Sequence, residues 1–435
     1  MPSRHPSGLY VLFFTEMWER FGYYLMLAIF TLYLNEHLKM SEGEAASLYG
    51  TYIGLVYLSP LFGGMLADRL IGYRRSVILG AVLLALGYFL LAVDRMATFY
   101  LSLGILILGN GLFKPNISTL VGNLYPQGDM RRDSAFSIFY MGINIGALFA
   151  PLAAGYMRSR YGWSVAFATA GVGMSFGLLT FALLHRLLAV ADQRSSLSAV
   201  LQTPLPPEYE DRPDPPEVER ERIRALVVMC AIVMLFWVAF HQNGSTLTFW
   251  ARDHTDRTLG GLLSHEINPE YFAAINPIFV ILLTPVVVST FSALRRRGLE
   301  PSTPAKIGIG MLLTAASFVI MVVASLVGGN TGKVHAMWIV SSYFVVTLAE
   351  LCLSPMGLSM VTKLAPRRMT AMMMGVWFLA TAIGNKLSGE IGIFWKLWPH
   401  HWFFGMLVAS SLAAAALLTV QLRRLAAAMP KEGHP

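Results

Sequence analysis

Twelve hydrophobic segments of roughly 20 residues, separated by short polar stretches, run through the 435-residue chain. A helix needs about 20 predominantly apolar residues to cross the ~30 Å hydrocarbon core of a bilayer. Hydrophobic residues make up 55% of the sequence and charged residues 13%, which is the balance of a membrane protein. The pattern predicts an all-α membrane protein with twelve transmembrane helices, at residues 9–34, 45–68, 76–93, 97–122, 134–157, 163–188, 223–250, 270–293, 305–327, 335–362, 369–394 and 401–422.

One long polar stretch interrupts this pattern, between the sixth and the seventh segment. Residues 189–222 are rich in Pro, Glu, Asp and Arg and include L-P-P-E-Y-E-D-R-P-D-P-P-E. A segment of this composition cannot bury a core, so we interpret it as a cytoplasmic linker. It divides the chain into an N-terminal six-helix bundle at 1–188 and a C-terminal six-helix bundle at 223–435.

The net charge of +8 follows membrane topology and does not indicate a nucleic-acid partner. With the N-terminus in the cytoplasm, 22 of the 33 Lys and Arg residues fall on the cytoplasmic side and eight outside, with Arg20, Lys114 and Lys386 inside helices. This is the positive-inside asymmetry, and it predicts a multi-pass inner-membrane protein with both termini in the cytoplasm. Because the first apolar segment carries charges, we do not expect it to be a cleavable signal peptide.

The first segment carries an unusual density of charge for a helix in lipid. Residues 16–24 read E-M-W-E-R-F-G-Y-Y, and at about 100° per residue Glu16, Glu19, Arg20 and Tyr23 fall on one face. Glu16 and Arg20 are four residues apart and can neutralise each other. Charged residues at this depth usually mark a pathway for ions or substrate, so we expect a functional site here.

This segment also carries a family resemblance. The pattern E-x-x-E-R-F-x-Y-Y resembles the first-helix signature of the proton-dependent oligopeptide transporters, a branch of the major facilitator superfamily, at Glu16, Glu19, Arg20, Phe21, Tyr23 and Tyr24. Residues 63–75 resemble the superfamily's loop between helices 2 and 3. The resemblance covers almost the whole chain. It implies the major facilitator fold, in which two six-helix halves enclose a site at the midplane, without the two extra helices that many bacterial members insert.

Polar residues in later spans match the same family. Lys114 precedes Pro115 in the motif K-P-N-x-S, and an ammonium group at this depth needs a carboxylate partner. Asn144 lies in F-Y-M-G-I-N-I-G, which matches the family's helix-5 signature. Its amide suits the backbone of a peptide, whereas helix packing explains the neighbouring Gly142 and Gly146.

A carboxylate in the tenth span completes this set. Glu350, with Ser354 one turn later, lies in a segment that resembles the family's E-x-x-x-S-P-x-G-L-S. Glu350 is the carboxylate that we expect beside Lys114 or beside the amino terminus of a peptide. Weaker matches in helices 2, 8 and 11 add Tyr57, Asn276 and Trp377.

The chain departs from the family at two positions. Many members carry an arginine one turn after the Tyr-Tyr pair, where this chain has Leu27, and an acid before Gln in helix 7, where it has His241. The resemblance implies that these positions form an outer-side salt bridge in other members, and losing both charges together leaves neither unpaired. His241 is a candidate for proton coupling, or a structural hydrogen-bonding residue.

The resemblance implies a proton-coupled symporter that imports di- and tripeptides by alternating access, without a cofactor. Such a substrate is zwitterionic, so it needs a cation, a carboxylate and several amide or hydroxyl partners. The candidates for substrate binding are Arg20, Tyr23, Tyr24, Tyr57, Lys114, Asn144, Asn276, Glu350, Ser354 and Trp377. The candidates for proton coupling are Glu16, Glu19, Arg20, His241 and Glu350.

Other functions on the same fold stay open. A proton-coupled carrier of another small solute, such as a nitrate-like anion, an amino acid or a drug, is the main alternative, and a non-transporting sensor is another. A drug exporter should lack the pair of cations, Arg20 and Lys114, that suits a carboxylate. An enzyme is disfavoured because the helices contain no metal-ligand spacing, nucleophile elbow or phosphate loop. We expect the protein to function as a monomer.

Four further residues are expected to have structural roles. Cys230 and Cys352 both lie within spans and are interpreted as small core residues without a disulfide. Lys386 and Glu390 lie one turn apart near the outer end of the eleventh span, and a local ion pair accounts for them.

Overall fold

The structure is a computed structural model that describes residues 5–125, 129, 131–192, 216–329, 331–364 and 370–428. Twelve helices of 19 to 31 residues dominate it, in the number and order that the hydrophobic segments predict. Nine helical segments among the described residues are long and apolar enough to cross a membrane by length and composition. The first helix has the length of a span but carries three charged residues, Glu16, Glu19 and Arg20, near its middle.

The first six long helices follow one another with short connections. They are α1 (Ser7–Leu32), α2 (Glu42–Leu66), α3 (Tyr73–Leu91), α4 (Met96–Asn123), α5 (Arg131–Tyr161) and α6 (Trp163–Leu184). Short π or 3-10 turns extend three of them, at η1 (Tyr33–His37), η2 (Ala67–Ile71) and η3 (His185–Asp192). The turn into α3 depends on Gly72, whose φ of 79° is readily adopted only by glycine.

The last six long helices follow the linker region. They are α8 (Pro216–Phe240), α10 (Ile275–Arg296), α11 (Thr303–Gly328), α12 (Met337–Leu364), α13 (Thr370–Ile391) and α14 (His400–Ala428). The seventh predicted span is helical but not uniform, because α8 passes through a 3-10 turn, η5 (His241–Gly244), into α9 (Thr246–Asp253). Shorter elements are β1 (Thr255–Asp256), η6 (Pro269–Ala274), β2 (Val334–His335) and η8 (Gly392–Trp395), and β1 and β2 pair in parallel.

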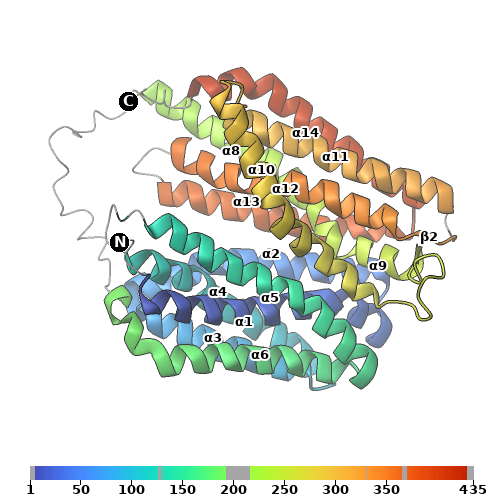
Figure 1. The fold of residues 1–435 in the computed structure, drawn as a ribbon, viewed down its shortest axis with the longest axis horizontal. Helices are drawn as coiled ribbons and strands as arrows, with labels where there is room; N and C mark the ends of the chain where they lie inside the picture. The colour runs from blue at the N-terminus through green and yellow to red at the C-terminus, as the bar shows by residue number, and fades with distance from the viewer. Residues whose placement is uncertain are drawn as a thin grey trace. The chain divides into compact units, whose positions relative to one another are not determined.

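The helices group into two compact units. Unit 1 contains Met1–Ile29 and Leu55–Pro213, and unit 2 contains Phe30–Gly54 and Asp214–Pro435. Residues 30–54, which comprise the end of α1, η1 and the first half of α2, therefore pack with the helices of the C-terminal half (Figure 1). In chain order these residues belong to the predicted N-terminal bundle, so the contacts group the chain differently from the predicted boundaries at 188 and 223.

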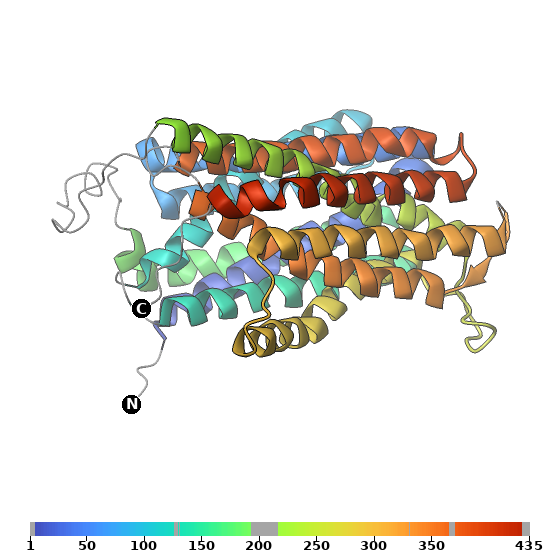
Figure 2. The ribbon, with the colours of Figure 1, turned by 90° about the horizontal axis from the view of Figure 1, so that it is seen from above.

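Each unit has its own packed core. In unit 1, α3 lies against α4 and α6, and the backbones of α3 and α4 approach so closely that a methyl group on Gly80 would lie 2.7 Å from the carbonyl oxygen of Gly109. In unit 2, side chains from α8, α11, α12, α13 and α14 form one apolar cluster that includes Phe236 and Trp377. Figure 2 shows these long helices from above.

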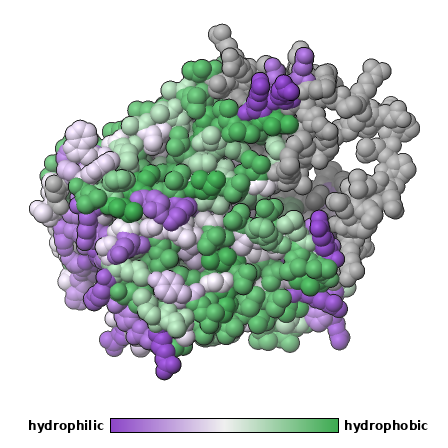
Figure 3. Space-filling view, turned by 180° about the vertical axis from the view of Figure 1, so that it is seen from behind, coloured by the Kyte–Doolittle hydropathy of each residue, from purple (hydrophilic) through white to green (hydrophobic). Residues whose placement is uncertain are grey.

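The outer surface is largely apolar, as a protein embedded in lipid requires. Leu, Val, Ile and Phe side chains on most of the long helices are exposed, for example Leu108, Leu183 and Val286. In Figure 3 hydrophobic residues cover much of the face shown, whereas hydrophilic residues gather mainly toward its edges. The helices therefore present their apolar sides outward as well as inward.

Candidate functional site

The charged residues of α1 form a buried ion cluster in unit 1. The helical spacing places Glu16, Glu19 and Arg20 together, as predicted, and all three are less than a tenth exposed. Arg20 donates from Nε to Glu19 and from Nη2 to the Glu19 Oε1 atom at 2.6 Å. Its Nε atom also lies 3.5 Å from Glu16 Oε1. A guanidinium group shared between two carboxylates is therefore the centre of this cluster.

Lys114 of α4 adds a second cation to the cluster. Its Nζ atom hydrogen-bonds to Glu16, so an ion pair links α4 to α1. The sequence predicted that Lys114 needs a carboxylate and offered Glu350 either for Lys114 or for the amino terminus of a peptide, but in unit 1 Glu16 supplies the charge beside Lys114. The four residues comprise two carboxylates and two cations, and this balance makes burial of all four charges tolerable.

Tyrosines and a close helix contact surround Arg20. The guanidinium carbon lies 4.7 Å from the centre of the Tyr23 ring, which in turn packs edge-on against Tyr24 at 5.3 Å. The helix α5 also approaches α1 closely at Gly146, where an added methyl group would lie 2.4 Å from the Met17 carbonyl oxygen. The helix-packing role predicted for this glycine is confirmed.

Asn144 is placed near this contact, but its side chain is already hydrogen-bonded. Its Nδ2 atom donates to the Tyr140 carbonyl oxygen one turn earlier, at 2.9 Å. The amide oxygen is the group that a peptide N–H could use without breaking that bond. Tyr57 lies on α2, in unit 1, and is partly buried.

A second polar group lies in unit 2, around Glu350. Asn276 of α10 donates from Nδ2 to Glu350 Oε2 at 2.9 Å and to Thr347 Oγ1 at 3.0 Å. Thr347 in turn donates to the Tyr343 carbonyl oxygen. The structure therefore brings the predicted pair Asn276 and Glu350 together, and it adds Thr347, which the sequence did not single out although it lies one helical turn before Glu350.

The remaining predicted residues lie elsewhere in unit 2. Trp377 is 4% exposed and belongs to the apolar core. His241 is the first residue of η5, where α8 ends, and it stacks on Trp237 with ring centres 5.4 Å apart. The side chain of Ser354 lies outside the described part of the chain. Among the described residues, no group of three or more His, Cys, Asp or Glu side chains could hold a metal ion.

Known proteins resemble the chain over nearly its whole length. A family model described as POT family matches residues 74–199 and 215–396, which is more than half of the chain. The uncharacterized transporter YclF of Bacillus subtilis is 35% identical, over 95% of this chain and 93% of its own length. The peptide transporter YePEPT of Yersinia enterocolitica is 34% identical, over 89% and 88%. The crystal structure of a peptide transporter POT in complex with sulfate is 32% identical, with a TM-score of 0.89 and coverage of 98% and 96%.

Proposed function

The chain belongs to the POT family, and from this premise we propose that it imports di- and tripeptides together with protons across the inner membrane. It is a transporter and not an enzyme, and it has the all-α major facilitator fold. The protein is a multi-pass membrane protein. We place both termini in the cytoplasm, because that orientation puts most of the Lys and Arg residues inside, and we propose that the monomer is the working unit.

The observation that carries this proposal is the buried cluster of Arg20, Lys114, Glu16 and Glu19. Both cations that suit a peptide carboxylate already contact a carboxylate of the protein. A substrate carboxylate therefore competes with Glu19 or Glu16 for the same cations. Protonation of one of these acids removes the competitor and frees a cation for the substrate.

This competition provides a physical basis for coupling. Without a proton, a peptide carboxylate would add a third negative charge to a cluster that is neutral and buried, which is unfavourable. With a proton on Glu19, the added carboxylate restores neutrality beside Arg20. Proton and substrate therefore bind together more favourably than either alone.

Glu350 is the group that we assign to the ammonium end of the peptide. Its hydrogen-bond partner Asn276 is neutral, so a substrate ammonium would be the first cation beside it among the described contacts. Asn276 bonds to one carboxylate oxygen only, which leaves the other oxygen for the ligand. Tyr23, Tyr24 and Tyr57 of unit 1 supply hydroxyl groups for the peptide backbone.

Uptake into proteoliposomes tests the proposal. We expect a labelled dipeptide to accumulate when the outside is acidic, and accumulation to stop when a protonophore collapses the gradient. Unlabelled tripeptide should compete, whereas nitrate or a single amino acid should not. Accumulation of nitrate or of an amino acid, without competition by peptides, would assign the alternative substrate class instead.

A further inference from the structure

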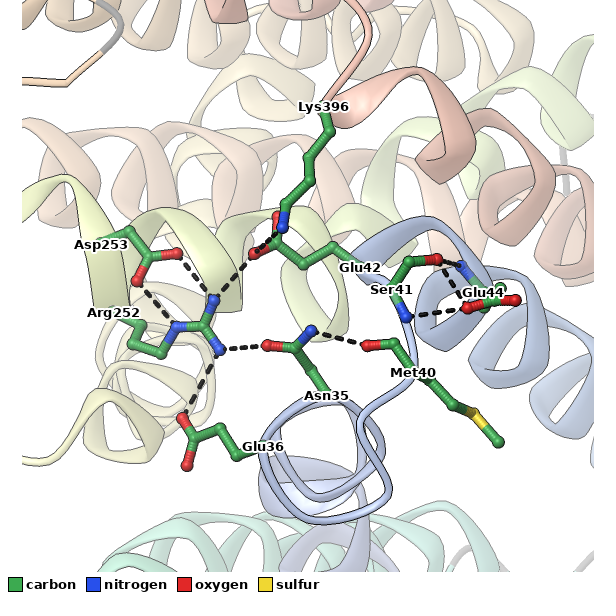
Figure 4. A network of polar contacts seen from close by, with 9 residues as sticks. All are labelled: Asn35, Glu36, Met40, Ser41, Glu42, Glu44, Arg252, Asp253 and Lys396. Carbon is green, nitrogen blue, oxygen red and sulfur yellow. Dashed lines mark hydrogen bonds and ion pairs between the residues drawn. The ribbon is translucent and has the colours of Figure 1, made fainter.

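A second ion cluster lies in unit 2 around Arg252 of α9 (Figure 4). It shares no residue with the ion cluster of α1. Arg252 donates from Nη1 to Asn35 Oδ1 at 2.7 Å and from Nη2 to Glu42 Oε1 at 2.9 Å. Its Nη1 atom also lies 3.5 Å from Glu36 Oε1. One guanidinium group therefore contacts two residues of η1, Asn35 and Glu36, and the first residue of α2, Glu42.

These acceptors are held in place locally. Asn35 donates from Nδ2 to the Met40 carbonyl oxygen at 2.8 Å. The start of α2 has a reciprocal cap, in which the Ser41 backbone N–H donates to Glu44 and the Glu44 N–H donates to Ser41 Oγ. This cap fixes the first turn of α2, where Glu42 lies. The segment thus presents a preformed set of acceptors to Arg252.

A second contact of the same kind joins α2 to α13. Lys386 Nζ donates to Thr51 Oγ1 at 2.7 Å, and Ser47 Oγ donates to Glu390 Oε1 at 2.7 Å. Lys386 and Glu390 are also paired with each other, as the sequence predicted. Between these bonds the two backbones nearly touch, because a methyl group added to Gly50 would lie 2.6 Å from the Asn385 carbonyl oxygen.

Both contacts share a feature that makes them reversible. Arg252 also binds the adjacent Asp253 through two bonds of 2.8 Å, and Lys386 has Glu390 one turn away on its own helix. Each cation therefore keeps a carboxylate on its own side if residues 30–54 move away. Separation breaks several hydrogen bonds but leaves neither cation without a counter-ion.

A buried polar group near the crossing of α2 and α13 also favours their separation. Asn385 is fully buried, and neither atom of its side-chain amide hydrogen-bonds to a described group of the protein. A buried amide without partners is unfavourable. The Asn385 carbonyl oxygen lies at the contact between α2 and α13, so we expect movement of α2 away from α13 to admit water to this residue and reduce that cost.

We propose that Arg252, with Lys386 as a second contact, forms an outer gate that fastens residues 30–54 to α9 and α13 and opens in each transport cycle. The inference rests on the proposed transport function and on the cytoplasmic position of the termini. The assigned gate residues are Arg252, Asn35, Glu42, Asp253, Lys386 and Glu390.

Accessibility of the helix crossing tests the gate without depending on transport. Asn385→Cys places a thiol at the crossing, and Cys is smaller than Asn, so it fits the same space. A membrane-impermeant maleimide is applied from outside to vesicles of known orientation. The parent protein, whose Cys230 and Cys352 are buried, gives the background.

When added to the Asn385→Cys reporter protein, Glu42→Gln and Arg252→Gln should each accelerate labelling by about tenfold, which corresponds to ~1.4 kcal/mol. Asp253→Asn should slow labelling, because Arg252 then loses the partner that it keeps when the gate opens. Lys333→Gln is the matched control, since the ion pair of Lys333, with Glu266 at 2.8 Å, is exposed and involves none of residues 30–54. We expect the Lys333→Gln control to be labelled at the same rate as Asn385→Cys without a further substitution.

Unchanged labelling in both Glu42→Gln and Arg252→Gln would overturn the gate, even in a protein that transports peptides. Faster labelling in Asp253→Asn would overturn the reversible design. Each variant is also checked for a monodisperse elution profile, and Arg252→Lys, which keeps the charge but loses the fork of donors, should label between the reporter and Arg252→Gln. Failure of the proposed function would appear separately: the variants would change the labelling rate as expected, but the parent protein would not take up peptide.

Discussion

Replacing Glu19 by Gln isolates the coupling role of the α1 cluster. Glu19 is fully buried and receives two hydrogen bonds from Arg20. Gln keeps the size and one acceptor oxygen but removes the charge, so Glu16 alone must serve both Arg20 and Lys114. Hydrogen bonds to charged groups contribute about 1.5–3 kcal/mol each, and one of the two is weakened rather than lost. We therefore expect a loss of about 2–3 kcal/mol of unfolding free energy in a protein that still inserts and folds.

The functional effect should be larger than the stability effect. Glu19→Gln imitates the protonated acid permanently, so it should bind peptide but should not exchange a proton. In proteoliposomes, gradient-driven accumulation of a labelled dipeptide should fall to background. Counterflow, in which internal unlabelled peptide exchanges with external labelled peptide, should persist within a few-fold of the parent rate.

The matched control is Glu300→Gln. Glu300 also pairs with an arginine and a lysine, Arg295 at 2.5 Å and Lys306 at 2.6 Å, but it lies between α10 and α11, outside the spans. These two cations lower the pKa of the Glu300 carboxyl to about 2. We expect this variant to accumulate peptide normally. Undiminished accumulation by Glu19→Gln, or equal loss in both variants, would refute the coupling role of Glu19.

Four further expectations follow from the contacts. Lys114→Ala should leave Glu16 with Arg20 as its remaining partner and should abolish uptake, whereas normal uptake would remove Lys114 from the site. Asn276→Ala should raise the KM for peptide severalfold, measured by concentration-dependent uptake, since Glu350 loses its positioning bond. Asn385→Leu removes an unsatisfied buried amide and should raise the melting temperature, with a gain of about 1–3 kcal/mol; a lower melting temperature would contradict that account of the crossing. His241→Gln removes a titratable imidazole while keeping a hydrogen-bonding side chain, so it should shift or flatten the pH profile of uptake if His241 carries protons, and an identical profile would assign His241 a structural role.

The features that follow from local periodicity were predictable from the sequence. Twelve apolar segments required twelve helices, because helix length follows from bilayer thickness. The i,i+4 spacing of Glu16 and Arg20 predicted their contact without any knowledge of the fold. The same reasoning predicted the ion pair between Lys386 and Glu390.

Contacts between distant helices were beyond such reasoning. The sequence established that Lys114 needs a carboxylate but could not select Glu16 over Glu350, because that choice depends on how α4 packs against α1. Thr347 carries no charge to mark it, so only its bond to Asn276 reveals it. The grouping of residues 30–54 with the C-terminal helices was likewise hidden, since it arises from tertiary contacts such as Arg252 with Glu42.

The two ion clusters follow one physical rule. In each, a guanidinium group bonds strongly to a carboxylate next to it in sequence, Glu19 for Arg20 and Asp253 for Arg252. Each also contacts a second acid, Glu16 in the first cluster and Glu42 in the second. A cation with two carboxylates can release one without being left unpaired, and in the buried α1 cluster an isolated charge would be very costly. A transporter must break and re-form contacts in every cycle, so this redundancy lowers the barrier to each step. We therefore expect that removing the adjacent acid in either cluster slows the cycle more than it destabilises the folded protein.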